Sequence, residues 1–156
     1  MPLCGVIDMA HQYPLTLAWS GNTLEDPYSR NAVANAGGKI AIPVSSAAEY
    51  AGSAQRWNPE DLLGTALATC HMLTFLALCA KAKVKVTRYE DNAMAVLDTV
   101  EKITSVTEIH LNPCIRVAPG TSKAKVEDLF QKAHKYCFVA NSIKSKVVMN
   151  PRIIEA

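Results

Sequence analysis

The cysteines are the residues of this 156-residue sequence that offer the most distinctive chemistry. They are Cys4, Cys70, Cys79, Cys114 and Cys137. Their number is odd and no two have CxxC spacing, which disfavours both a disulfide-stapled secreted scaffold and a structural zinc site. A free thiol has a pKa of about 8.5 and reacts as its thiolate, so a catalytic cysteine needs a neighbour, such as a guanidinium, that favours the charged form. Reactive thiol chemistry is therefore open to this chain.

Three of the cysteines have informative positions. Cys79 follows Cys70 by nine residues, which places the two thiols on opposite sides of a helix, so they cannot pair within it. Cys137 follows a second predicted helix and can approach Cys70 only through the fold. Cys4, in an expected flexible tail at residues 1–11, and Cys114, on a predicted strand, are interpreted as ordinary small residues.

Two histidines lie close in sequence to these thiols, and their roles stay open. His71 adjoins Cys70 but points about 100° away from it round the helix, which favours a buried structural residue. His134 and Cys137 have i, i+3 spacing, which allows an imidazole near that thiol. A zinc site built from these groups lacks a nameable fourth ligand, so neither a metal nor another cofactor is expected.

One long helix is predicted at residues 58–83. Asn58 is a good N-cap, Pro59 suits the first helical position, and the acidic Glu60 favours the positive end of the helix dipole. From residue 62 to residue 80 the helix is apolar on nearly every face, which is typical of a membrane span or a fully buried helix. It is the only such segment, it is rich in alanine and threonine, and strand-like sequence follows it at once. We therefore expect a central helix covered partly by a second copy of the chain, and so a homodimer.

The remaining periodicity predicts strands and one more helix, and an α+β fold in a single domain over residues 1–156. The predicted elements are strands at 12–19, 28–36 and 39–44, a hairpin of strands 84–100 and 101–117 around Glu101, a helix capped by Ser122, and a last strand at 146–154.

Composition limits the partners. Charged residues make up 19% of the chain and the formal net charge is +2, which argues against nucleic acid or a membrane surface as the main partner. The N-terminal sequence has neither a charged n-region nor a long apolar h-region, so a cytoplasmic location is expected.

Two segments carry a resemblance to a known family. NPEDLLGTALATCHMLTFLALCAKAKVKV, in which NPE is followed ten residues later by Cys70, and AHKYCFVANSI, which contains Cys137, resemble the OsmC/Ohr family of osmotically inducible and organic hydroperoxide resistance proteins. The resemblance extends from about Trp19 to the C-terminus. It implies an intertwined homodimer in which antiparallel sheets enclose the long helix. His-Met-Leu after Cys70, where the hydroperoxide resistance branch usually has phenylalanine, places the chain nearer the OsmC-like branch.

The resemblance also implies a function and a set of site residues. It implies a thiol peroxidase for organic hydroperoxides, with hydrogen peroxide as a further candidate substrate. Cys70 would attack the peroxide, Cys137 would resolve the resulting sulfenic acid as a disulfide, and an external dithiol, for which a lipoylated protein is the candidate, would reduce it. Glu60 matches the family glutamate that holds an arginine, and that arginine is Arg30 or, as the alternative, Arg56. A different class of function stays open: a non-enzymatic dimer that binds a small apolar ligand or senses oxidants.

Helix spacing adds one constraint. Glu60 and Cys70 are about 15 Å apart along an unbroken helix, too far for one arginine to serve both within a chain. The expected solution is a shared site, with Arg30 and Glu60 of one subunit facing Cys70 and Cys137 of the other.

Overall fold

A computed structural model describes residues 10–156 of the chain. The described residues form two compact units, which divide between Pro59 and Glu60. Cys4 and most of the predicted tail at residues 1–11 lie outside the described residues, and the assignment of the whole chain to one domain stays a prediction.

The first unit contains a small antiparallel sheet in the order β1-β2-β3. Its elements are β1 (Thr16–Ala18), β2 (Ala32–Asn35), β3 (Ile42–Val44) and the short 3-10 helix η1 (Ala48–Tyr50). Gly37 and Gly38 have φ of 36° and 70°, a backbone region that favours glycine, and they form the predicted turn between β2 and β3. The three predicted strands are confirmed, although each is shorter than its alternating pattern indicated.

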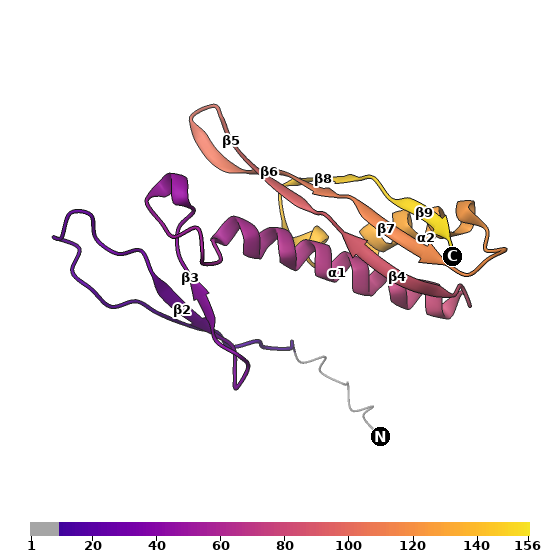
Figure 1. Cartoon of the computed structure of the whole chain (residues 1–156), viewed down its shortest axis with the longest axis horizontal. Coiled ribbons are helices and arrows are strands. Elements are labelled where there is room, and N and C mark those ends of the chain that lie inside the picture. Colours follow the sequence, from indigo (N-terminus) through magenta and orange to yellow (C-terminus); the bar gives the residue numbers. More distant parts are fainter. Residues whose placement is uncertain (1–9) are drawn as a thin grey trace, which may run out of the picture. The chain divides into compact units, whose positions relative to one another are not determined.

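The second unit packs two helices with two three-stranded sheets (Figure 1). Its sheets have the orders β4-β7-β9 and β5-β6-β8. The elements are α1 (Pro59–Lys81), β4 (Val86–Asp91), β5 (Met94–Val100), β6 (Ile103–Leu111), β7 (Pro113–Val117), α2 (Lys123–Tyr136), η2 (Ala140–Ser142), β8 (Lys146–Met149) and β9 (Arg152–Glu155).

The hairpin predicted around Glu101 is confirmed between β5 and β6. Glu101 and Lys102 both have positive φ, 50° and 68°, as the tight turns of two-residue hairpins require. Each predicted strand of this hairpin is nevertheless broken in two, and the outer parts, β4 and β7, pair in the other sheet. At the break, the backbone N–H of Asn112 donates to Asp91 Oδ1 at 2.7 Å, and its side chain donates to the Asn92 carbonyl at 3.0 Å.

The two sheets of the second unit are mixed, which corrects the expectation of purely antiparallel sheets there. β8 runs parallel to β6, and β9 runs parallel to β7. Parallel neighbours need a crossover connection between their strands. Helix α2 lies between β7 and β8 in the chain and supplies that connection. The last predicted strand is also divided, at Asn150 and Pro151, so that one part joins each sheet.

Helix α1 buries one stripe of side chains within its own chain. The buried residues follow helical spacing and are Gly64, Leu67, His71, Phe75 and Cys79. Although α1 is long and apolar enough by composition to cross a membrane, a core helix passes the same test, and 28% of its most apolar stretch is buried in this chain. The predicted long helix is confirmed, but the single chain buries only one stripe of it, so its full coverage by a second copy stays a prediction.

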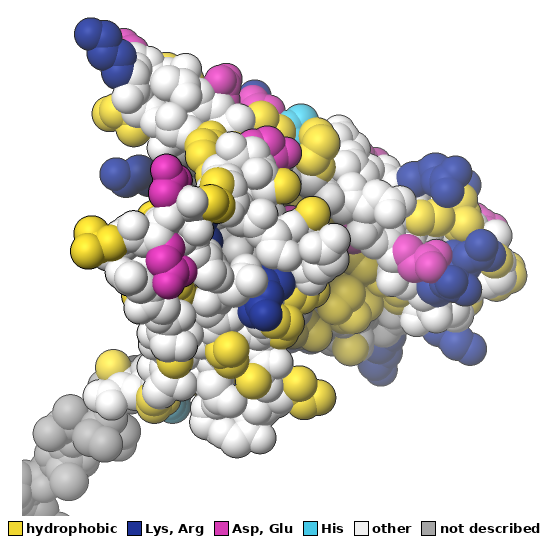
Figure 2. Space-filling model, turned by 60° about the vertical axis from the view of Figure 1, so that its left-hand side comes forward, with side chains coloured by type: hydrophobic (Ala, Val, Ile, Leu, Met, Phe, Trp, Pro, Cys, Tyr) yellow, Lys and Arg dark blue, Asp and Glu magenta, His cyan; other side chains and the backbone are white. Residues whose placement is uncertain are grey.

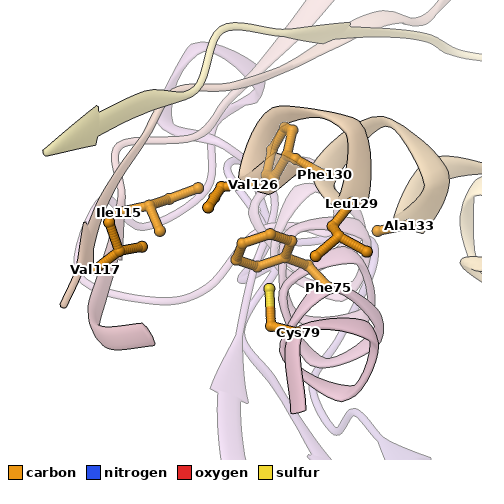
Figure 3. Packing of buried hydrophobic residues seen from close by; sticks show 8 residues of the cluster. All are labelled: Phe75, Cys79, Ile115, Val117, Val126, Leu129, Phe130 and Ala133. Atoms are coloured by element: carbon orange, nitrogen blue, oxygen red, sulfur yellow. The ribbon is translucent and has the colours of Figure 1, made fainter. Parts of the chain in front are cut away.

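Helix α2 covers the C-terminal half of that stripe. Ser122 is its N-cap, as predicted, and its hydroxyl accepts the backbone N–H of Lys125 at 3.3 Å. Figure 3 shows α1 and α2 side chains pointing toward one another, together with two residues of β7. Phe75 and Phe130 meet edge to face at 5.5 Å between ring centroids, a favourable aromatic geometry. The α1–α2 contact fixes the positions of the thiol in α1 and of the thiol that follows α2.

Candidate active site

The structure brings Cys70 and Cys137 together at one end of the α1–α2 contact. Cys70 lies in the middle of α1, beside the buried stripe, and is half buried. Cys137 is the first residue after α2 and is fully buried in the core cluster formed with Leu67, Ile109 and Leu111. The two sulfurs lie within hydrogen-bonding reach of each other, and both are free thiols.

Four donors surround the sulfur of Cys70. They are the backbone N–H groups of Val139 and Phe138, the thiol of Cys137 and the hydroxyl of Thr74. Burial alone would raise the pKa of the Cys70 thiol, but these donors together outweigh it and lower the pKa below its ordinary value. Cys70 is therefore the member of the pair that ionises more readily.

Cys137 has the opposite character. Burial raises the pKa of its thiol, and the neighbouring Cys70 sulfur, where charge develops, adds to that rise. The backbone N–H of Ala140 acts the other way, donating to the Cys137 sulfur at 3.4 Å. A protonated Cys137 can thus donate its S–H to a Cys70 thiolate, which makes the pair a charged nucleophile beside a neutral thiol.

The turn after α2 holds this arrangement, and it explains the ANS segment of the sequence. The side-chain amide of Asn141 donates to the carbonyls of Lys135 and Cys137, both at 3.0 Å. The hydroxyl of Ser142 donates to the Phe138 carbonyl at 2.7 Å. These bonds cross-link the turn, in which three backbone N–H groups bond the two sulfurs.

The other described cysteines lie in different surroundings. Cys79 is buried in the α1–α2 core, where burial raises its pKa to about 11. Cys114 lies on β7 and accepts a bond from the Arg152 guanidinium at 3.4 Å. Neither Cys79 nor Cys114 is among the groups that hydrogen-bond to Cys70 or Cys137.

The second unit contains both thiols and Glu60 but neither of the predicted arginines. Arg30 lies in the first unit, where it donates to the Tyr28 carbonyl at 2.9 Å and stacks on the Tyr28 ring. Arg56 is in the same unit and donates to the Ala32 carbonyl at 3.2 Å. Glu60 is the second residue of α1, and its Oε2 is buried with no hydrogen-bond partner among the described residues. The roles of these three residues stay predictions.

The two histidines form a pair of their own. His71 is fully buried in the stripe of α1, and its ring lies 4.4 Å from that of Phe130. Burial, reinforced by the nearby His134, lowers the pKa of His71 to about 4. The Phe130 carbonyl lies close enough to favour the charged form slightly, yet no hydrogen bond of good geometry reaches either ring nitrogen. Within residues 10–156, no three potential metal ligands gather around these rings.

Two features of the site were not found from the sequence. Thr74 lies four residues after Cys70, so helix spacing alone could have placed its hydroxyl on the same face. The backbone N–H groups of Phe138 and Val139 carry no side-chain signal, and only the shape of the turn reveals them.

Comparison with known proteins places the chain in a family. The family model described as OsmC-like protein matches residues 52–152, a range that includes Glu60, Cys70 and Cys137. The protein named peroxiredoxin OsmC of Escherichia coli K12 is 28% identical over 93 residues, which cover 60% of this chain and 64% of that relative. The chain thus matches less than two thirds of that relative's length.

Solved structures agree in fold. An OsmC-like protein of unknown function from Vibrio cholerae is 30% identical, has a TM-score of 0.82, and matches over 93% of this chain and 100% of its own. An organic hydroperoxide resistance protein from Elizabethkingia anophelis has a TM-score of 0.73 at 18% identity, covering 96% of this chain and 100% of its own. The expected α+β fold is confirmed by both, and the chain belongs to the family of OsmC-like proteins.

Proposed function

We propose that this protein is a thiol peroxidase that reduces organic hydroperoxides with Cys70 as its nucleophile. The observation that carries the proposal is the asymmetry of the thiol pair. Cys70 is half buried and has a lowered pKa, whereas Cys137 is fully buried and has a raised one. A peroxide entering from solvent meets the more reactive sulfur first. The name peroxiredoxin of the related Escherichia coli protein supports the same reaction class.

The reaction uses both sulfurs in turn. The Cys70 thiolate attacks one peroxide oxygen, the O–O bond breaks, and the alkoxide leaves as an alcohol after taking up a proton. Cys70 is then a sulfenic acid, and Cys137 condenses with it to form a disulfide and release water. Thiol–disulfide exchange with an external dithiol, such as a lipoylated protein, returns both thiols. No metal or other cofactor enters this cycle.

Peroxide consumption tests the proposal directly. With dithiothreitol as reductant, the protein should consume cumene hydroperoxide, and Cys70→Ser should abolish that activity because no nucleophile remains. Cys114→Ser removes a thiol outside the pair and serves as the matched control, with activity expected to be unchanged. A parallel assay with hydrogen peroxide ranks the substrates. A wild-type protein that consumes neither peroxide would refute the proposal and favour a dimeric ligand-binding protein or an oxidant sensor.

An arginine should complete the site across a dimer. Because α1 is continuous between Glu60 and Cys70, the two are about 15 Å apart along its axis. We propose that Arg30 and Glu60 of one subunit face the thiols of the other, where the guanidinium stabilises the thiolate and polarises the peroxide. The buried, unpartnered Oε2 of Glu60 supports a role in binding such a cation.

Exposed apolar surface supports the dimer. Leu17 in β1, and Tyr13 and Leu15 just before it, are more than two thirds exposed, and Leu73 of α1 is 57% exposed. Figure 2 shows apolar side chains at the surface in several places on one face of the protein. A second copy of the chain that covered these side chains would remove their apolar surface from water, which favours the dimer.

A mixed dimer tests the shared site. Arg30→Ala and Cys70→Ser homodimers should both be inactive, whereas a heterodimer of the two variants should keep one complete site and about half the wild-type activity per dimer. That site combines Arg30 of the Cys70→Ser chain with Cys70 of the other chain. Heterodimers are prepared with two affinity tags, and sedimentation confirms the dimer.

Two results would contradict the shared site. An inactive heterodimer would place Arg30 and Cys70 of one chain at the same site. Full activity of the Arg30→Ala homodimer would remove Arg30 from the mechanism, and the same experiment with Arg56→Ala would then test the alternative arginine.

A further inference from the structure

Thr74 places a hydroxyl group beside the reacting sulfur. It lies four residues after Cys70 in α1, on the same face of the helix. Its hydroxyl donates to the Cys70 carbonyl at 2.8 Å, and hydrogen bonding by the same hydroxyl is one of the causes that lower the pKa of the Cys70 thiol. Thr74 is half buried, so water competes only partly for this donor.

The Thr74 hydroxyl has one proton and two acceptors in reach. A neutral thiol is a weak acceptor, so the carbonyl takes the proton while Cys70 is protonated. A thiolate is charged, and hydrogen bonds to charged groups are roughly twice as strong as neutral ones. Leaving the carbonyl costs little, since the backbone N–H of Thr74 bonds the same Cys70 oxygen in the regular pattern of an α-helix.

We propose that Thr74 is a catalytic residue whose hydroxyl turns from the Cys70 carbonyl to the Cys70 sulfur when the thiolate forms. The N–H groups of Phe138 and Val139 are fixed by the turn that follows α2, whereas the Thr74 hydroxyl can rotate. It therefore adds stabilisation that is specific to the ionised state. The proposal rests on the proposed function for the role of the thiolate as nucleophile.

A purely structural role is the ordinary alternative. Threonine in a helix often donates to the carbonyl four residues earlier, and this bond alone would leave the reactivity of the thiol unchanged. The two roles differ in one observable, the pH at which Cys70 becomes reactive.

The experiment measures alkylation of Cys70 by iodoacetamide as a function of pH in the full-length, reduced protein. Peptide mass spectrometry follows Cys70 separately from the other thiols. Thr74→Val keeps the side-chain shape without the hydroxyl, and we expect it to raise the midpoint by about half to one pH unit and to slow alkylation below the midpoint about three- to tenfold. Thr74→Ser should restore the wild-type profile. Thr65→Val, an exposed threonine earlier in α1, is the matched control and should change nothing.

A Thr74→Val profile that coincides with wild type would overturn the proposal, as would a Thr74→Ser profile that follows Thr74→Val. Circular dichroism checks the fold of each variant, and Thr74→Ala replaces Thr74→Val if the valine variant does not fold. Because alkylation needs no peroxide, its result is independent of the proposed function. A shifted midpoint in a protein without peroxidase activity would leave the thiolate role of Thr74 standing and refute only the peroxidase.

Discussion

Cys137→Ser should reduce one equivalent of peroxide per site in a fast step and a second in a slower step, and then stop. The first step needs only the Cys70 thiolate, and a serine hydroxyl at position 137 can still donate to that thiolate as the thiol does. Without a resolving thiol, the sulfenic acid persists and excess peroxide oxidises it to sulfinic acid, which a dithiol does not reduce. Steady-state turnover should fall strongly, because every later cycle then requires the external dithiol to reach the Cys70 sulfenic acid before a second peroxide does. Mass spectrometry of the Cys70 peptide gives the oxidation state directly.

Serine and alanine at position 137 separate two roles of the residue. Cys137→Ala removes the donor as well as the resolving thiol, so Cys70 alkylation near neutral pH should be slower in Cys137→Ala than in Cys137→Ser. In the wild type, mild peroxide should give one Cys70–Cys137 disulfide within the chain. Oxidation that links Cys70 to Cys79 or Cys114 instead would show that the resolving thiol has been misassigned.

The long helix could be predicted from sequence because its signals are local. A capping asparagine, a proline at the first helical position, an acidic first turn and a lysine in the last turn fix α1 to within two residues at each end. The Ser122 cap of α2 is a signal of the same kind. Local chemistry of this type does not depend on which other elements the helix meets.

The paths of the strands depend on distant contacts and were predicted less well. Residues 84–117 alternate as one long hairpin would, yet the ribbon divides near Asn92 and Asn112 so that its two halves enter different sheets. The pattern of apolar residues specifies which side of a strand is buried, not which neighbour it pairs with. The parallel course of β8 and β9 follows from the position of α2, which no residue in those strands encodes.

The same distinction applies to the site. The i, i+4 relation of Cys70 and Thr74 is local and readable, and the two thiols could be named from a family motif. The N–H groups that lower the Cys70 pKa depend on the conformation of a turn whose side chains give no hint of it. The choice between Arg30 and Arg56 is a long-range question of the same kind, since no local spacing relates either residue to a thiol on α1.

Acid should destabilise the protein through His71, and His71→Leu should remove that effect. His71 is fully buried and its pKa is about 4, compared with about 6.5 for an unfolded histidine. Above pH 6.5 the residue is neutral in both states and contributes no pH dependence. As the pH falls, the unfolded chain binds a proton that the folded chain does not, so the free energy of unfolding decreases. The loss attributable to His71 should reach about 2 kcal/mol at pH 5 and about 3 kcal/mol at pH 4.

Urea unfolding of wild type and His71→Leu at a series of pH values measures this difference. Leucine has a similar volume and leaves no buried ring nitrogen without a partner, so the variant should be at least as stable as wild type at pH 7. The stability difference between the two proteins should then widen below pH 6.5, while carboxylates that titrate in both proteins cancel in the comparison. His11→Gln removes an exposed histidine and should keep the wild-type pH dependence. A constant difference between wild type and His71→Leu from pH 7 to pH 4 would mean that folding does not keep His71 neutral, and that water or another group reaches its ring.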